Sequence, residues 1–153
     1  MSGDIITKAA GSAPGGAYYF DELEVGMRAE YVREVTMDGI LMFAVISGDN
    51  NPVHLDEEFA AEHTPFGDTI AHGLLTASYL STVLGTRLPG PGAIYINQSV
   101  KFRSPVHVGD QVTAVVEVEE LIEDKKFVVL HTQCLVGDKV VLEGRATLMP
   151  PKR

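Results

Sequence analysis

Only one of the 153 residues is a cysteine, which excludes an intrachain disulfide. A lone cysteine is typical of proteins from reducing compartments, and Cys134, which no motif surrounds, is expected to pack as a small apolar side chain. The sequence also lacks a run of about 18 apolar residues, which argues against a transmembrane helix. Glycine loops of the GxGxxG and GxxxxGK[ST] types are absent, so neither kind of nucleotide-binding fold is expected.

Positive charge is scarce as well. Lys and Arg total 12 against 21 Asp and Glu, which gives a formal net charge of −9. A negative field of this kind repels polyanions and anionic membrane surfaces. We therefore expect neither nucleic acid nor a membrane as a partner. Residues 1–16 lack the apolar core of an export signal, so the expected location is the cytoplasm.

Length and composition predict a single domain preceded by a tail. The apolar and charged fractions, 45% and 22%, are ordinary for a globular protein. Residues 11–16 are glycine, serine, alanine and proline, which resist helix and strand formation. We accordingly expect residues 1–17 to be a flexible N-terminal tail and residues 18–153 to form the domain.

The first half of the domain is predicted to be mainly loops and helices. Residues 27–35 are typical of a first strand, and Thr36 offers an N-cap hydroxyl to a helix that should end at Gly48. Asp56 is a second N-cap, with acidic residues in the first turn of a helix over residues 57–63.

The second half is predicted to be one long helix followed by strands. Apolar residues recur at helical spacing over residues 71–84 and no charge lies between Asp68 and Arg87, so this helix should be buried. The predicted strands cover residues 93–102, 111–123, 126–136 and 139–149, with turns at 124–125 and 137–138. This order predicts an α+β fold in which an antiparallel sheet wraps around a long apolar helix.

The first chemically informative segment is residues 47–56, which contains Asp49 and His54. Pro52 forces the preceding residue into an extended conformation, so the loop could bring both side chains toward one point. A carboxylate and an imidazole that share a water suit proton transfer at neutral pH. The alternative is that these are ordinary turn residues without a catalytic role.

The second segment, residues 66–73, leads into the long helix. The backbone N–H groups at a helix start carry partial positive charge, and Gly73 would let a ligand approach them closely. Such a position suits stabilisation of an oxyanion. Alternatively, His72 and Gly73 only cap the helix. Ser81 could face the same loop, or it could be an ordinary small helix residue.

Taken together, the chain resembles the MaoC-like (R)-specific enoyl-CoA hydratases of the hot-dog superfamily. The resemblance extends over residues 19–149. It is carried by residues 47–56, 66–67, 70–73, 88–92, 102–106 and 108–110, which occur in the family's order and at similar spacing.

The resemblance implies a hot-dog domain that dimerises side by side. It also implies reversible hydration of a trans-2-enoyl-CoA to an (R)-3-hydroxyacyl-CoA without a metal or redox cofactor. Asp49 and His54 match the family's catalytic pair, Ser81 matches a serine in the pocket, and the Gly73 N–H matches the donor to the thioester oxygen. An unpartnered sheet edge would independently favour a homo-oligomer.

Several residues are expected to contact the acyl-CoA substrate. By resemblance, Leu84 and Leu148 would form the floor of the acyl pocket and favour short chains of about four to six carbons, unless both are simply core residues. Lys101, Arg103 and Arg87 would attract the coenzyme A phosphates unless they are only solvated surface charges. Asn51 would hold the loop or the water, or it would only precede a proline.

Two other functions stay open on the sequence alone. A hot-dog thioesterase would also use a carboxylate but would attack the thioester carbonyl. A non-catalytic module for acyl-CoA or acyl carrier protein would be expected to have lost one of the catalytic pair, whereas Asp49 and His54 are both present.

Overall fold

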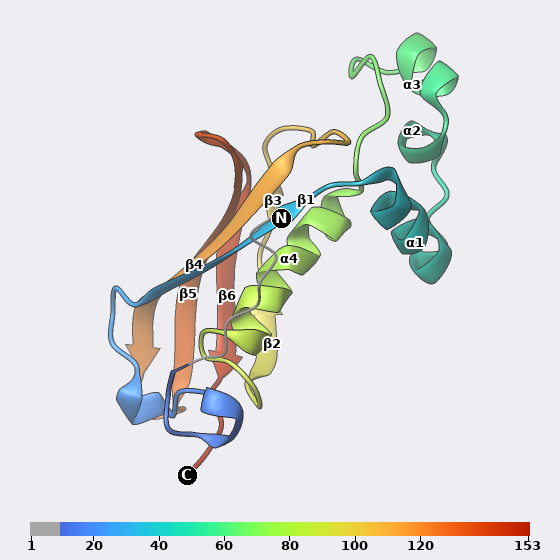
Figure 1. The fold of residues 1–153 in the computed structure, drawn as a ribbon. Coiled ribbons are helices and arrows are strands. Elements are labelled where there is room, and N and C mark those ends of the chain that lie inside the picture. Colours follow the sequence, from blue (N-terminus) through green and yellow to red (C-terminus); the bar gives the residue numbers. More distant parts are fainter. Residues whose placement is uncertain (1–9) are drawn as a thin grey trace.

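The computed structural model describes residues 10–153 (Figure 1). Its sheet has six strands in the order β1-β4-β5-β6-β2, with β3 also paired to β6, and every pairing is antiparallel. The strands are β1 (Arg28–Glu34), β2 (Ile94–Gln98), β3 (Lys101–Phe102), β4 (Gln111–Ile122), β5 (Phe127–Val136) and β6 (Lys139–Met149). The predicted α+β class with an antiparallel sheet is confirmed.

Helix α4 (Gly73–Thr86) runs along one face of the sheet and packs on β1, β4 and β5 (Figure 1). It buries Thr76, Leu80, Val83 and Leu84, as expected of the helix at the centre of the core. Its first turn differs from the prediction, because Leu74 is 64% exposed. None of the helices within residues 10–153 has the length and apolar character needed to span a membrane.

Three shorter helices precede α4 and lie beyond its N-terminal end (Figure 1). The Thr36 hydroxyl accepts the Gly39 N–H at 3.0 Å, Gly48 has a φ of 80°, and Asp56 accepts the Phe59 N–H at 3.0 Å. These contacts confirm the predicted caps. The helices are α1 (Met37–Ser47), α2 (Pro52–Leu55) and α3 (Glu57–His63), of which α2 was not predicted.

The N-terminal segment differs from the expected tail. Residues 1–9 of that tail lie outside the described residues, whereas residues 10–17 fold against the domain and include a short 3-10 helix, Pro14–Gly16. Ala13 is 4% exposed and Ala17 is 0% exposed. The composition resists regular structure, but small side chains permit close packing against the turn at residues 88–92. A Cβ atom on Gly15 would lie only 3.0 Å from Cβ of Pro91. The packed domain therefore begins before residue 18.

The expected strand over residues 93–102 is divided into β2 and β3. Between them, the Ser99 N–H donates to the Arg145 carbonyl of β6 at 2.9 Å. A Cβ atom at Gly144 would lie 1.8 Å from the Ser99 carbonyl oxygen, so the two backbones approach too closely for a side chain. The strand is interrupted at this close approach.

Cys134 lies in β5 and is 0% exposed. Burial raises the pKa of its thiol to about 12, which keeps the sulfur protonated and unreactive at neutral pH. The expectation of a packed, inert cysteine is confirmed.

Candidate active site

The loop between α1 and α2 holds Asp49 at the surface. The Asp49 carboxylate accepts the Asn51 N–H at 3.2 Å, and the Asn51 side chain accepts the Val53 N–H at 3.1 Å. Asn51 is therefore the N-cap of α2, with Pro52 in the first helical position. These local bonds begin the single-turn helix that carries His54.

His54 is 8% exposed and faces the segment that precedes α4. Its Nδ1 lies 2.8 Å from the Ile70 carbonyl oxygen. A carbonyl only accepts, so Nδ1 carries the hydrogen and Nε2 keeps a lone pair. Burial is the main influence that lowers the pKa of His54 below its ordinary value, and His72 lowers it further, against the opposing effects of the Ile70 hydrogen bond and Asp49. The imidazole is thus suited to accept a proton at neutral pH.

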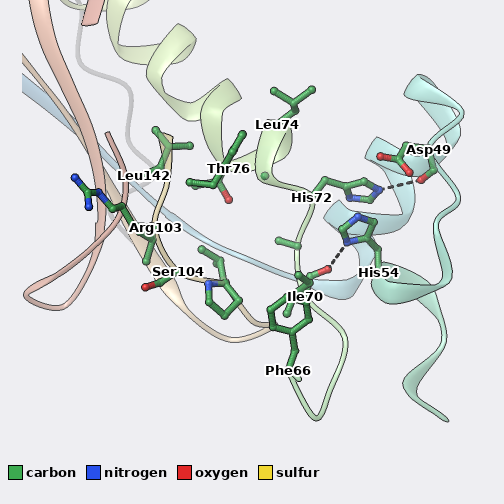
Figure 2. A pocket seen from close by; sticks show the side chains of 16 residues that line it. Asp49, His54, Phe66, Ile70, His72, Leu74, Thr76, Arg103, Ser104 and Leu142 are labelled. Carbon is green, nitrogen blue, oxygen red and sulfur yellow. Dashed lines mark hydrogen bonds between the residues drawn. The ribbon is translucent and has the colours of Figure 1, made fainter. Parts of the chain in front are cut away.

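His72 contacts Asp49 and His54 and directly precedes Gly73. From the sequence, His72 was interpreted only as a helix cap or a packed residue. Its ring makes no capping hydrogen bond; instead Nε2 donates to the Asp49 carbonyl at 3.0 Å. Its ring stacks on that of His54, with centroids 3.9 Å apart and planes at 26° (Figure 2). No spacing rule links residues 54 and 72, so only the folded chain places the second histidine here.

The possible ligand atoms of Asp49, His54 and His72 all lie within 4.8 Å of one another. Metal ligands must direct their lone pairs at one point, whereas stacked imidazoles direct theirs along nearly parallel planes. The cluster therefore suits proton transfer better than metal ligation.

A cavity of about 440 Å³ adjoins this cluster (Figure 2). Asp49, His54 and His72 line one side, next to Gly73 at the first position of α4. An N–H at this helical position has no acceptor within its own helix and carries partial positive charge. Figure 2 shows Thr76, Arg103, Ser104 and Leu142 across the cavity from the histidines. The cavity thus brings together a carboxylate, an imidazole suited to accept a proton, and the first N–H of a helix.

Phe102 adds a wall to the cavity at Gly73. A Cβ atom on Gly73 would lie 2.5 Å from Cε1 of the Phe102 ring, so a side chain there would require the ring to move. The phenylalanine is 55% exposed and also lines the cavity. The glycine therefore has a packing reason as well as the predicted reason of ligand approach.

Three residues assigned to the pocket from the resemblance do not line the cavity of this chain. Ser81 is exposed, on the same side of α4 as Leu74 and Ser78. Leu84 is 0% exposed and Leu148 is 2% exposed, and both belong to the hydrophobic core. The floor expected from the two leucines is thus absent from the cavity of the single chain, because both side chains pack between α4 and the sheet.

Of the other four residues predicted to contact the substrate, one lines the cavity and three do not. Arg103 lines the cavity and forms an ion pair with Glu143. Asn51 caps α2 and Lys101 is exposed on β3, and neither lines the cavity. Arg87 follows α4, roughly 20 Å from the helix start at 1.5 Å per residue, and bonds a carbonyl of β1. Only Arg103 is therefore placed to meet a ligand at this cavity.

Comparison with known proteins agrees with the fold and with the family resemblance. Residues 21–138 match the MaoC like domain. The chain is 50% identical to an (R)-specific enoyl-CoA hydratase of Rhodospirillum rubrum over 89% of this chain and 94% of that protein. It is 53% identical to a 3-hydroxybutyryl-CoA dehydratase of Methylorubrum extorquens, over 88% and 85% of the two chains.

A solved structure shows the same architecture. An (R)-hydratase from A. caviae involved in PHA biosynthesis superposes with a TM-score of 0.81 and 45% identity, covering 84% of this chain and 98% of that one. The matched domain model covers more than half of the chain, and the sheet around α4 agrees with the resemblance noted from the sequence. The chain belongs to the MaoC-like family and has its hot-dog fold.

Proposed function

We propose that the chain reversibly adds water to a trans-2-enoyl-CoA and forms an (R)-3-hydroxyacyl-CoA. The observation that carries the proposal is the meeting of Asp49, His54 and the start of α4 at Gly73 on one cavity. Relatives at 50% and 53% identity are named for the two directions of this reaction, an enoyl-CoA hydratase and a 3-hydroxybutyryl-CoA dehydratase.

The Asp49 and His54 pair would bind and activate the water. The water oxygen bonds to C3 of the enoyl group as one of its O–H bonds breaks, and a proton is added at C2. The lone pair on Nε2 of His54 and the Asp49 carboxylate are the groups that can receive and return these protons. Asp49 lies on the loop before α2 and His54 lies on α2, and the hydrogen bonds of this loop and of the α2 N-cap hold the two side chains at the cavity.

The N–H of Gly73 would stabilise the charge that the addition creates. Attack at C3 moves electron density through C2 to the thioester oxygen. A helix N–H of fixed direction stabilises this oxygen without reorganising in the transition state. Addition of water involves no net oxidation or reduction, so the proposed reaction needs no redox cofactor. The Gly73 N–H takes the place of a Lewis acid at the thioester oxygen, so the proposal includes no metal either.

The thioester carrier is proposed to be coenzyme A, as in the names of these relatives. Its phosphates need a local cation in a chain of net charge −9. Arg103 is half exposed at the cavity, so phosphates would compete with Glu143 for it, and Lys101 lies two residues away on the same segment. The cytoplasmic location expected from the sequence stays part of the proposal, supported by the lone buried Cys134.

A second copy of the chain is the proposed partner. One side of α1 exposes apolar residues to a degree unusual for a helix surface, with Met42 at 70%, Val45 at 84% and Ile46 at 85%. Edge strand β2 also exposes Ile94 and Ile96. A homodimer would cover these surfaces, and light scattering in solution should then report twice the chain mass of 16.5 kDa.

The assay with crotonyl-CoA tests the function directly. Hydration removes the absorbance of the conjugated enoyl thioester without releasing a thiol, and chiral analysis of the product should give the (R) isomer. Thiol release would instead identify a thioesterase. Binding with neither change would identify a non-catalytic acyl-CoA module.

A preference for short acyl chains is also proposed. Leu84 and Leu148 are core residues in this chain and do not support this preference. Its support is the relative named for the four-carbon substrate 3-hydroxybutyryl-CoA. We expect kcat/KM to fall about 30-fold or more from crotonyl-CoA to octenoyl-CoA. Octenoyl has two methylenes beyond a pocket for about six carbons, and each should cost about 1 kcal/mol or more. An octenoyl-CoA value equal to or above the crotonyl-CoA value would contradict the preference.

The pH dependence of hydration follows from the environment of His54. Its pKa is lowered from 6.5 mainly by burial, so the neutral form that accepts a proton persists below this pH. The titratable neighbours of His54 are Asp49 and His72, and we expect the acid midpoint of kcat/KM to lie below 6.5. A profile with crotonyl-CoA, with folding checked by circular dichroism at each pH, measures the midpoint. An acid midpoint at or above 6.5 that belongs to His54 would contradict the assignment.

A further inference from the structure

His72 connects the parts of the candidate site, although neither the resemblance nor the proposed chemistry gives it a role. The residue is 2% exposed and directly precedes Gly73. It contacts the Asp49 carbonyl through Nε2, the His54 ring by stacking, and the Phe43 ring at a centroid distance of 4.8 Å (Figure 2). One side chain thus touches both members of the pair and is covalently joined to the oxyanion donor.

The direction of the bond to Asp49 fixes where the His72 proton lies. The backbone oxygen of Asp49 can only accept, so the hydrogen is on Nε2. Nδ1 is buried and has no hydrogen-bond partner within residues 10–153. Nε2 is therefore the atom through which His72 donates to the Asp49 loop.

The hydrogen bond from His72 to Asp49 joins residues far apart in the sequence, unlike the other hydrogen bonds of Asp49. The Asp49 N–H donates to the Ser47 hydroxyl and the Asp49 carboxylate accepts the Asn51 N–H, so both contacts are within the loop. The His72 bond spans 23 residues and ties the loop to the start of α4. The His54 bond to Ile70 ties α2 to the same segment.

This connection matters because the substrate is rigid where it reacts. C3, C2 and the thioester carbonyl of an enoyl thioester form one planar conjugated unit. The group that activates water at C3 and the N–H that meets the carbonyl oxygen must therefore stand at a fixed separation. An error of about 1 Å in such a separation lowers a rate by up to about 10²-fold.

We propose that His72 is a positioning residue that sets the placement of Asp49 and His54 relative to the Gly73 N–H, chiefly through its hydrogen bond to the Asp49 carbonyl. The proposal rests on the hydratase function proposed above. A residue that merely filled the core would affect stability and leave the turnover of the folded enzyme unchanged. A positioning residue lowers kcat while substrate binding is retained.

Two substitutions separate the hydrogen bond from the ring. In His72→Gln, the side-chain amide can donate from nearly the place of Nε2 but cannot stack. In His72→Phe, the ring can still stack on His54 and Phe43 but has no donor. For crotonyl-CoA we expect kcat to fall about 10- to 100-fold in His72→Phe and less than about tenfold in His72→Gln, with KM within about threefold of wild type in both.

His63→Gln on α3 is the matched control, because this histidine is 61% exposed and does not line the cavity. Thermal unfolding of each variant shows whether it is folded. Wild-type turnover in folded His72→Phe would overturn the proposal, and so would equal losses in both variants. If His72→Phe does not fold, His72→Gln decides, since a loss of more than about tenfold contradicts the hydrogen-bond role. A wild-type enzyme that does not hydrate crotonyl-CoA would overturn the proposed function itself.

Discussion

Asp49→Asn should lower kcat for crotonyl-CoA hydration by about 10²-fold or more, the usual contribution of a proton-transfer group. The carboxamide oxygen can still accept the Asn51 N–H, so the loop keeps its local bond while the carboxylate charge is removed. His54→Asn should have a similar effect, because its amide nitrogen can take the place of Nδ1 and donate to the Ile70 carbonyl. This variant preserves the structural bond and removes only Nε2.

Matched substitutions outside the cavity control for both changes. Asp124→Asn lies in the exposed turn between β4 and β5, and His63 is exposed on α3. Both controls should turn over at the wild-type rate. If Asp49→Asn or His54→Asn kept more than about a tenth of wild-type kcat while folded, the pair could not be the proton-transfer groups.

Local signals in the sequence predicted much of the fold. The caps at Thr36, Gly48 and Asp56 form as expected because each depends on a side chain or backbone within a few residues. The strands at residues 139–149 and 111–123 have the expected positions to within about one residue. Alternation and turn residues determine these elements over short distances.

Helix α2 escaped prediction because it has only four residues. A single turn is too short to show a hydrophobic period. Its signals were the N-cap Asn51 and Pro52 at the first helical position, the same two residues that were interpreted as a turn. The His54 side chain was therefore assigned to a loop, whereas a helix directs it toward Ile70.

Other parts of the site depend on tertiary placement. The contact of His72 with His54 joins segments whose approach is set by α1, α2 and the start of α4. Ser81 is exposed because the side of α4 that faces the sheet is occupied by Thr76, Leu80 and Val83. A side chain exposed in one chain reaches a pocket only if a second chain covers it, so the family role of Ser81 depends on the proposed dimer.

Gly73→Val should lower kcat/KM for crotonyl-CoA by about 10²- to 10³-fold, the loss typical for removal of one oxyanion donor. The added side chain would project into the cavity beside the N–H and would also displace Phe102, which a Cβ would approach to 2.5 Å. Gly85→Val is a suitable control, because it is a glycine of the same helix and a Cβ there meets nothing within 4 Å. Its turnover should remain near wild type.

The double variant Gly73→Val, Phe102→Ala separates the two reasons for a glycine at this position. Removal of the ring relieves the clash at Cε1 and leaves the valine beside the N–H. If the thioester oxygen must reach this N–H, the double variant stays as low as Gly73→Val, although Phe102→Ala alone is much more active. If the double variant instead recovers the activity of Phe102→Ala, the glycine serves only to accommodate the phenylalanine ring. The oxyanion donor would then have to be sought elsewhere on the cavity wall.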